Sequence, residues 1–238
     1  MTIAELIIIT VAAGAGAMVQ GSIGLGFTLT AGPALFLVDP GFAPGPVLLA
    51  GQLVSIRNIL GDRGETAWDV WRRSVAGIPI GIVAGLALLA MMSERTLAVT
   101  VALLTITAAS ALLAGWRVRP SGALDVGAGG ASAFASMVAG LPGPPLVVAY
   151  SELEPRCMRG TSASTIFTVG LIAAGSLALS GNFGSDEVEL MGLLMPGVVA
   201  GLLATRWTRP LVEQRWFRPV VLLVALAGGV VLLLRQLG

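Results

Sequence analysis

The sequence has no lysine and no histidine, so all 14 of its basic residues are arginines. Histidine is the commonest metal ligand and the side chain that usually titrates near neutral pH. The single cysteine, Cys157, has no partner for an intrachain disulfide, and one thiol cannot form a cysteine-based metal cluster. A net charge of +1 gives little attraction for nucleic acid. We therefore expect no metal, no cofactor and no nucleic-acid partner.

Charge of either sign is scarce. Charged residues make up 11% of the chain and hydrophobic residues 55%, with a mean hydropathy of +0.90. A soluble domain has about 25% charged residues, which cover its surface. The composition is therefore typical of an integral membrane protein. Residues 1–6 carry no basic cluster, and we expect no cleavable signal peptide.

Catalytic motifs are also missing. The sequence contains no GxSxG turn, no HExxH helix and no pair of acidic residues inside an apolar segment. Arg57 is the only ionisable residue that we place deep in an apolar segment. Charges inside membrane helices usually mark catalysis or proton transfer. Their scarcity predicts that the protein is not an enzyme and has no proton relay of its own.

Eight apolar segments divide the chain, and they approach or exceed the ~20 residues that span a bilayer. Backbone groups in lipid must be paired within the chain, so we expect every segment to be helical. The prediction is an all-α, multi-pass protein of a bacterial inner membrane. The segments are 2–38, 43–60, 68–92, 97–116, 123–150, 158–180, 188–205 and 217–234.

The first and fifth segments contain helix breakers near their middles. Segment 2–38 would be ~55 Å long as one helix at ~1.5 Å per residue, whereas the hydrocarbon core is only ~30 Å thick. It contains Gln-Gly-Ser-Ile-Gly-Leu-Gly at 20–26, and segment 123–150 contains Gly-Leu-Pro-Gly-Pro-Pro at 140–145. Proline removes a backbone donor, and glycine costs ~1 kcal/mol against alanine in a helix. Each segment is predicted to form two shorter helices around a non-helical turn.

The chain also contains an internal repeat. The hexapeptide Gly-Ile-Val-Ala-Gly-Leu at 81–86 recurs as Gly-Val-Val-Ala-Gly-Leu at 197–202, 116 residues later (81 to 197). The broken segments recur near the same offset. Duplicated halves with helix breaks at corresponding positions are typical of secondary transporters. We therefore predict two transmembrane repeats, residues 1–118 and 119–238.

Arginine placement predicts how the halves are oriented. If each broken segment returns to the side from which it started, only Arg95 and Arg235 lie on one side of the membrane. If each broken segment crosses once, the arginines are split almost evenly. The positive-inside rule favours the returning arrangement, in which the halves are inverted relative to each other. The arginines then assigned to the opposite side are Arg63, Arg72, Arg73, Arg117, Arg119, Arg156, Arg159, Arg206, Arg209, Arg215 and Arg218.

The helix breaks are the strongest functional signal. We match Gly21 and Gly24 with Gly140 and Gly143 of the second half. A helix that restarts after Gly21, with Ser22 as its N-cap, presents unpaired N–H groups, and a helix that restarts at the prolines after Gly143 would do the same. Because helix N-termini bind anions, two facing ends would form an anion site without a charged side chain. The alternative is close helix packing by small residues, which also fits the glycines of the two hexapeptides.

Polar side chains of the next helix in each half are further candidates for contact with an ion. They would replace its hydration shell, or else form interhelical hydrogen bonds worth about 0.6 kcal/mol each. Arg57 either extends to the membrane interface or attracts the anion. The residues that share a helix face are Gln52, Ser55 and Asn58 in the first half, and Thr161, Ser164, Thr165 and Thr168 in the second.

Together these motifs resemble the signatures of the TauE/SafE sulfite exporter family. Residues 20–27, followed by small residues and Pro33, resemble the first signature, 139–145 resemble its second copy, and 160–162 resemble the motif that opens the next helix. The prolines at 144–145 stand where many relatives have glycines. The resemblance spans essentially the whole chain and implies a permease for sulfite, an organosulfonate or a related sulfur anion. The site residues that it implies are Gln20, Gly21, Ser22, Gly24, Gly140, Pro142, Gly143, Thr161 and Ser162.

The expected function is export of a small anion through the lipid bilayer by alternating access. Backbone N–H groups at 22–24 and around Gly143 would bind the ion, with help from Gln20, Gln52 and hydroxyls of segment 158–180. An inside-negative potential favours anion efflux by ~2.3 kcal/mol per charge per 100 mV. An anion channel and a non-transporting assembly subunit stay open as alternatives, and so does homo-oligomerisation.

Overall fold

The computed structural model describes residues 1–61, 64–115, 118–181, 183–212 and 217–237. These ranges contain ten α-helices, one short 3₁₀ turn and no strand, which confirms the all-α prediction. The helices are α1 (Ile3–Ile23), α2 (Phe27–Val38), α3 (Gly45–Gly61), α4 (Trp68–Leu89), α5 (Glu94–Leu113), α6 (Gly122–Ala139), α7 (Gly143–Ala149), α8 (Pro155–Leu179), α9 (Ser185–Val212) and α10 (Phe217–Leu237). Of the arginines that predict the orientation, Arg63, Arg117 and Arg215 lie outside the described residues, as do the side chains of Arg209 and Arg218.

Six of these helices are long and apolar enough to cross a membrane, namely α1, α4, α5, α8, α9 and α10. Large apolar side chains cover their outer surfaces. Leu179 is 93% exposed and Ile80 is 73% exposed, as expected of side chains that face lipid and not water. The chain is therefore a multi-pass membrane protein.

Both predicted helix breaks are present. The backbone leaves helical geometry after α1 and after α6, where Gly24 and Gly140 adopt left-handed φ angles of 99° and 62°. Glycine takes this conformation without the steric cost of a Cβ atom. After the first break, α2 folds back along α1. The two helices are close at Gly16, where an added Cβ would lie 2.8 Å from the carbonyl oxygen of Phe27 and 3.0 Å from Cβ of Ala31. The first broken segment is thus a hairpin of two helices.

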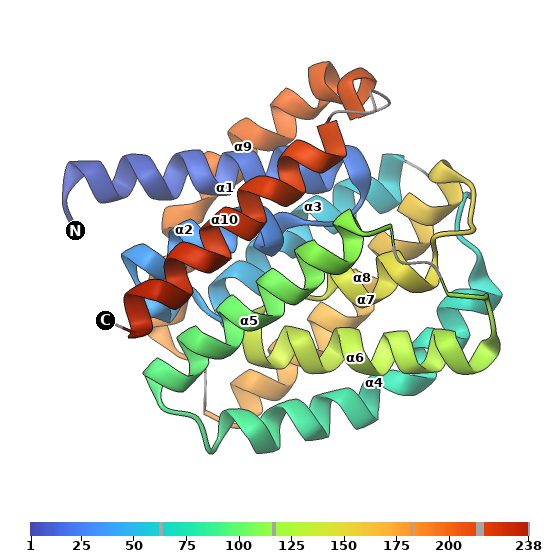
Figure 1. Ribbon diagram of the computed structural model, residues 1–238, viewed down its shortest axis with the longest axis horizontal. Coiled ribbons are helices and arrows are strands. Elements are labelled where there is room, and N and C mark those ends of the chain that lie inside the picture. Colours follow the sequence, from blue (N-terminus) through green and yellow to red (C-terminus); the bar gives the residue numbers. More distant parts are fainter. Residues whose placement is uncertain (62–63, 116–117, 182, 213–216, 238) are drawn as a thin grey trace.

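The helices run back and forth between two ends of the molecule (Figure 1). Both chain termini lie at the left of the view, and α4, α6, α8 and α10 all begin toward the right. Arg159 near the start of α8 and Asp186 near the start of α9 therefore lie at opposite ends. Arg95 and Arg235 lie at the end that holds the termini. The described arginines are concentrated at the other end.

Long helices pair across the middle of the sequence. α4 packs along α6 and α9 packs along α1, while α3 faces α8 and α5 faces α10. Glycines make the first two contacts close. A Cβ at Gly81 would lie 2.0 Å from the carbonyl oxygen of Gly130, and one at Gly197 would lie 2.3 Å from that of Thr10. The glycines of the repeated hexapeptide therefore serve helix packing, the alternative considered for them above.

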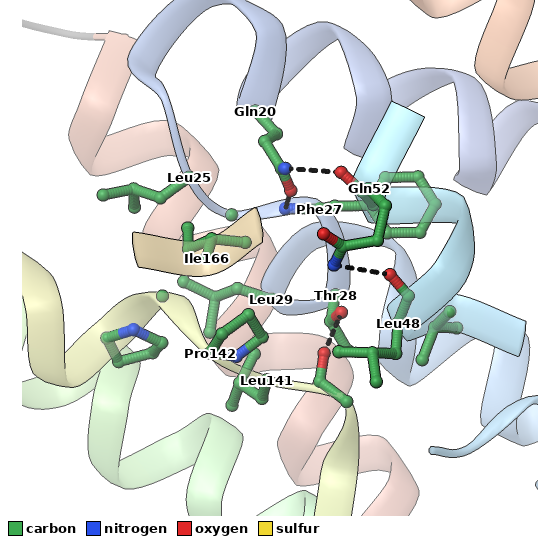
Figure 2. A pocket seen from close by; sticks show the side chains of 16 residues that line it. Gln20, Leu25, Phe27, Thr28, Leu29, Leu48, Gln52, Leu141, Pro142 and Ile166 are labelled. Carbon is green, nitrogen blue, oxygen red and sulfur yellow. Dashed lines mark hydrogen bonds between the residues drawn. The ribbon is translucent and has the colours of Figure 1, made fainter. Parts of the chain in front are cut away.

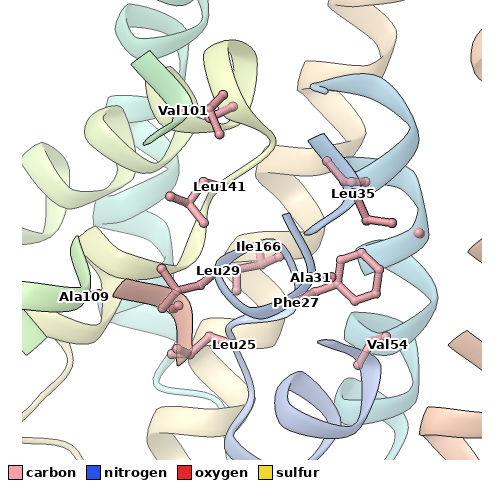
Figure 3. Close-up of a cluster of buried hydrophobic side chains, with 14 of the residues drawn as sticks. Leu25, Phe27, Leu29, Ala31, Leu35, Val54, Val101, Ala109, Leu141 and Ile166 are labelled. Atoms are coloured by element: carbon pink, nitrogen blue, oxygen red, sulfur yellow. The ribbon is translucent and has the colours of Figure 1, made fainter. Parts of the chain in front are cut away.

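The largest cluster of buried apolar side chains surrounds α2. Figure 3 shows Phe27 and Ala31 of this helix on the side of Val54 of α3, and Leu29 on the side of Leu141 and Ala109. A helix that is apolar on all sides is stable only when it is enclosed by other elements. The enclosure fixes the start of α2 in the interior of the molecule.

Candidate anion-binding site

The two helix breaks meet at one small cavity. A Cβ at Gly143 would lie 3.4 Å from Cβ of Leu25 and 3.7 Å from the backbone nitrogen of Gly26. Residues from both breaks, from α3 and from α8 line the cavity (Figure 2). The volume open to the centre of a water molecule is about 10 Å³, which is about the space that one water needs. This space is smaller than an oxyanion.

The two breaks contribute corresponding residues to this wall. The left-handed caps Gly24 and Gly140 are 116 positions apart (24 to 140), the same offset as that of the repeated hexapeptides. At this offset Leu25 corresponds to Leu141, and both line the cavity. The caps therefore favour an offset of 116 residues, whereas the match of Gly21 with Gly140 made from the sequence implies 119. That match aligned glycines by sequence similarity alone. The structure shows that each helix ends at a left-handed C-cap glycine, Gly24 or Gly140.

Gln20 holds the first break together. Its side-chain oxygen accepts from the N–H of Phe27 at 3.1 Å, and its Nε2 donates to the Gly51 carbonyl at 3.0 Å and to the Ser55 hydroxyl at 3.1 Å. The side chain is 3% exposed. One amide thereby joins α1, α2 and α3 at the edge of the cavity.

The carbonyl groups at the end of α1 are bonded by side chains of α3. Asn58 donates to the Gln20 carbonyl at 2.9 Å, and Arg57 donates to the Gly21 carbonyl at 3.3 Å. The Gln20 carbonyl also accepts from the C-cap N–H of Gly24, whereas the carbonyls after it lack intrahelical partners and carry partial negative charge. Arg57 therefore stabilises this helix end, a role that neither expectation for it included.

The donors expected at 22–24 lie elsewhere. Ser22 is still within α1, and its hydroxyl is 2.9 Å from that of Thr208 on α9. The N–H of Gly24 donates to the Gln20 carbonyl at 2.7 Å. The prediction that Ser22 caps a restarting helix is wrong, because the N-cap is Gly26, four residues after Ser22, and the helix restarts at Phe27.

The N–H groups that face the site belong to the first turn of α2. The first intrahelical bond of α2 runs from the N–H of Thr30 to the Gly26 carbonyl. The earlier N–H groups have no acceptor within the helix. That of Phe27 is bonded to Gln20, whereas Thr28 and Leu29 line the cavity. The positive end of the helix dipole points to the same place.

The second break presents fewer donors than predicted. α7 begins at Gly143 with Pro142 as its N-cap, and Pro144 and Pro145 follow. Proline has no N–H, so only Gly143 supplies a backbone donor among these four first-turn positions. The expectation that this helix end presents an array of N–H groups is wrong. The site is asymmetric, with its amides concentrated at α2.

Two further polar side chains lie at the cavity. The Thr28 hydroxyl donates to the Gly140 carbonyl at 2.5 Å and so joins the two breaks. The Gln52 amide donates to the Leu48 carbonyl at 3.2 Å. Figure 2 shows both side chains on the wall opposite Leu25. Among the described residues, no charged side chain lines this cavity.

The hydroxyls of α8 that were predicted to bind the anion do not line the cavity. Thr161 accepts from the N–H of Ala67 at 2.9 Å, and Thr165 lies 3.0 Å from the hydroxyl of Tyr150. Ser162 is fully buried, and its Oγ has no hydrogen bond among the described residues. None of the three lines the cavity, to which α8 contributes Ile166. Of the remaining predicted residues, the structure brings to the cavity wall Gln20, Gln52, Gly140, Pro142 and Gly143, whereas Gly21, Ser22, Gly24, Ser55 and Arg57 lie behind or beside it.

A second, larger cavity approaches the first break from the arginine-rich end. Its volume on the same measure is about 300 Å³, and Ser22, Ser151 and Arg159 contribute polar groups to its wall. Leu25 and Gly26 line this vestibule as well as the central cavity. Leu25 is 6% exposed and stands between the two spaces.

One buried acid lies at the start of an apolar segment. Asp125 lies in α6 with its side chain 7% exposed, and its Oδ2 accepts from Nε of Arg73 at 2.8 Å. Because Asp125 stands in the first turn of α6, at the edge of segment 123–150, it is not an ionisable residue deep in an apolar segment. Arg73 lies in a different helix, α4, so the ion pair with Asp125 cannot be predicted from the sequence of either segment alone. No three His, Cys, Asp or Glu side chains of the described part of the chain are grouped to hold a metal ion.

The architecture and the cavity define a multi-pass α-helical membrane protein whose central site lies between two broken helices. The sequence profile described as Sulfite exporter TauE/SafE matches residues 8–232. The chain belongs to this family of membrane permeases, which confirms the resemblance seen in its motifs. No curated protein and no solved structure matches the chain.

Proposed function

We propose that the protein exports sulfite or a small organosulfonate from the bacterial cytoplasm. The observation that carries this proposal is the convergence of both helix breaks on one uncharged cavity at the start of α2. Unpaired N–H groups and the helix dipole stabilise an anion there. A site without a fixed positive charge binds weakly enough to release its ion, which transport requires.

Alternating access explains why the central cavity is so small. The vestibule at the arginine-rich end is about 300 Å³, whereas the central space is about 10 Å³. We propose that Leu25 moves aside to admit the anion from this vestibule, and that the positive-inside rule places the vestibule in the cytoplasm. Labelling of cysteines introduced at Arg119 and at Ser185, in a Cys157→Ser background, tests the orientation. Reaction of both positions from the same side would contradict it.

The repeats at 1–118 and 119–238 remain a proposal, which the common offset of 116 residues (24 to 140, and 81 to 197) supports. The close contacts of α1 with α9 and of α4 with α6 cross between these halves. We therefore propose that the moving units are these two interlocked pairs, each with its broken helix. This replaces the expectation that the halves rock as continuous stretches of sequence.

Flux through purified protein in liposomes tests the proposed function. Vesicles loaded with sulfite should show saturable efflux that an inside-negative potential accelerates, since each charge gains ~2.3 kcal/mol per 100 mV. Unsaturable current far above transporter turnover would instead indicate a channel. Absence of both flux and sulfite binding would indicate a non-transporting subunit.

A further inference from the structure

One hydrogen-bond acceptor in the wall of the central cavity lacks a partner. Gln52 is 8% exposed, and its Oε1 is buried without a hydrogen bond to any described residue. Figure 2 shows this oxygen pointing away from Leu48 and toward the cavity. A buried carbonyl oxygen without a donor is costly and rare in folded proteins. The bound molecule is the natural source of that donor.

The neighbours of Gln52 determine how its amide is oriented. Its Nε2 donates to the Leu48 carbonyl at 3.2 Å, so exchange of oxygen and nitrogen would bring two acceptors together. Gly170 of α8 makes room for the amide, because a Cβ there would lie 1.9 Å from Nε2. The side chain is thus held from both sides with its oxygen facing the site.

Other polar groups near this oxygen have different roles. The side-chain oxygen of Gln20 is occupied by the N–H of Phe27, and the Gly140 carbonyl is occupied by the Thr28 hydroxyl. The N–H groups of Thr28 and Leu29 are donors without an acceptor in their helix. The wall therefore offers donors for charged oxygens together with one acceptor.

We propose that the site selects an oxyanion that carries a hydrogen-bond donor, namely hydrogensulfite or a hydroxy- or aminosulfonate. This inference rests on the proposed function and narrows its substrate class. The charged oxygens bind the N–H groups at the start of α2, and the hydroxyl or ammonium group donates to Gln52 Oε1. Sulfite dianion, sulfate and simple alkanesulfonates offer only acceptors or apolar groups to that oxygen. A site with an unpaired polar group discriminates strongly against ligands that leave it unpaired.

This selection also accounts for transport without a protein proton relay. Hydrogensulfite carries its proton across the membrane, so no side chain has to supply one. Hydrogensulfite has one negative charge, so the N–H groups of α2 have less charge to stabilise than a dianion would bring.

A matched pair of ligands tests the proposal. Hydroxymethanesulfonate and ethanesulfonate have the same charge and nearly the same size, and differ by a hydroxyl in place of a methyl group. Calorimetry on the purified full chain should show at least tenfold tighter binding of hydroxymethanesulfonate. In Gln52→Met, a side chain of similar length without an acceptor, the preference should fall below threefold while ethanesulfonate still binds.

A pH series on the wild-type protein needs no variant. Affinity for total sulfite should fall as the pH rises through the pKa of hydrogensulfite, whereas affinity for ethanesulfonate should stay level. Equal binding of the two sulfonates, retention of the preference in Gln52→Met, or a flat pH profile for sulfite would overturn the role of Gln52 and leave the proposed function standing. Failure of every sulfur anion to bind the folded protein would overturn both.

Discussion

The side-chain oxygen of Gln20 accepts a hydrogen bond from the backbone N–H of Phe27 across the first helix break, at 3.1 Å. One of the four unpaired N–H groups of α2 is thus satisfied by the protein itself. The remaining bonds of Gln20 reach α3, at Gly51 and Ser55. Gln20 therefore sets where α2 begins and how many of its N–H groups are left for an anion.

Gln20→Leu should destabilise the fold and weaken anion binding together. Loss of the buried amide leaves the N–H of Phe27 unpaired, at a cost of about 1–3 kcal/mol, and removes the donor that Gln20 supplies to Gly51 and Ser55. Unfolding in detergent, with and without sulfite, measures both effects. Gln20→Glu keeps an acceptor for Phe27 but adds a negative charge, so it should abolish binding with a smaller loss of stability. A stable Gln20→Glu protein that binds sulfite normally would contradict the account.

Thr28→Pro tests whether backbone amides bind the anion. Proline is tolerated in the first turn of a helix, where it removes only an N–H that has no helical partner. At the offset of 116 (28 to 144), Thr28 corresponds to Pro144, so the second break already accommodates this change. Binding of sulfite should weaken at least tenfold. Thr28→Val is the control, since it loses the hydroxyl bond to Gly140 but keeps the N–H, and it should weaken binding less than Thr28→Pro. Equal effects of the two variants would argue against an amide contact.

Gly197→Ala should separate packing from binding. The added Cβ would lie 2.3 Å from the Thr10 carbonyl oxygen, so α1 and α9 would have to move apart. Overpacking of this kind costs about 1–3 kcal/mol. Gly192→Ala in the same helix is the matched control, because its Cβ would meet nothing within 4 Å, and alanine favours helix. Thermal unfolding should show a lower midpoint for Gly197→Ala and an unchanged or higher one for Gly192→Ala. The reverse order would contradict the glycine contact.

Asp125→Asn tests whether the buried acid is structural. The change removes the charge that pairs with Arg73, whose side chain is 44% exposed. Because water can still reach the arginine, we expect a loss of about 1–3 kcal/mol, below that of a fully buried pair. Asp125→Asn combined with Arg73→Gln should recover part of the loss. Sulfite flux per folded molecule should remain within about threefold of wild type. A well-folded variant without flux would show that Asp125 belongs to the transport mechanism.

The sequence predicts the architecture better than the site, and the helix breaks show why. Glycine and proline have strong local effects, so the breaks after α1 and α6 could be placed within a few residues. The boundary itself depends on which glycine takes the left-handed conformation. Gly24 does so, three residues after Gly21, and this shift moves the available N–H groups from 22–24 to the start of α2.

The roles of the α8 hydroxyls could not be predicted from the local sequence pattern, because their hydrogen-bond partners come from distant segments of the chain. The hydroxyl of Thr161 faces the N–H of Ala67, and that of Thr165 faces Tyr150. Their common helix face is real, but it packs against other helices and not against the cavity. Ile166 beside them reaches the cavity instead. A helix face of small polar residues indicates that the face makes contacts, but it does not distinguish contact with another helix from contact with a ligand.

Selenite is the most direct probe of the site, because it has the shape and charge chemistry of sulfite and its selenium scatters anomalously. Crystals of the purified protein soaked in selenite should show a selenium peak between the two breaks. Its oxygens should lie within hydrogen-bond distance of the N–H groups of Thr28 or Leu29, at about 2.7–3.2 Å. A peak confined to the vestibule beside Arg159, or none between the breaks at saturating selenite, would contradict binding by the amides of α2.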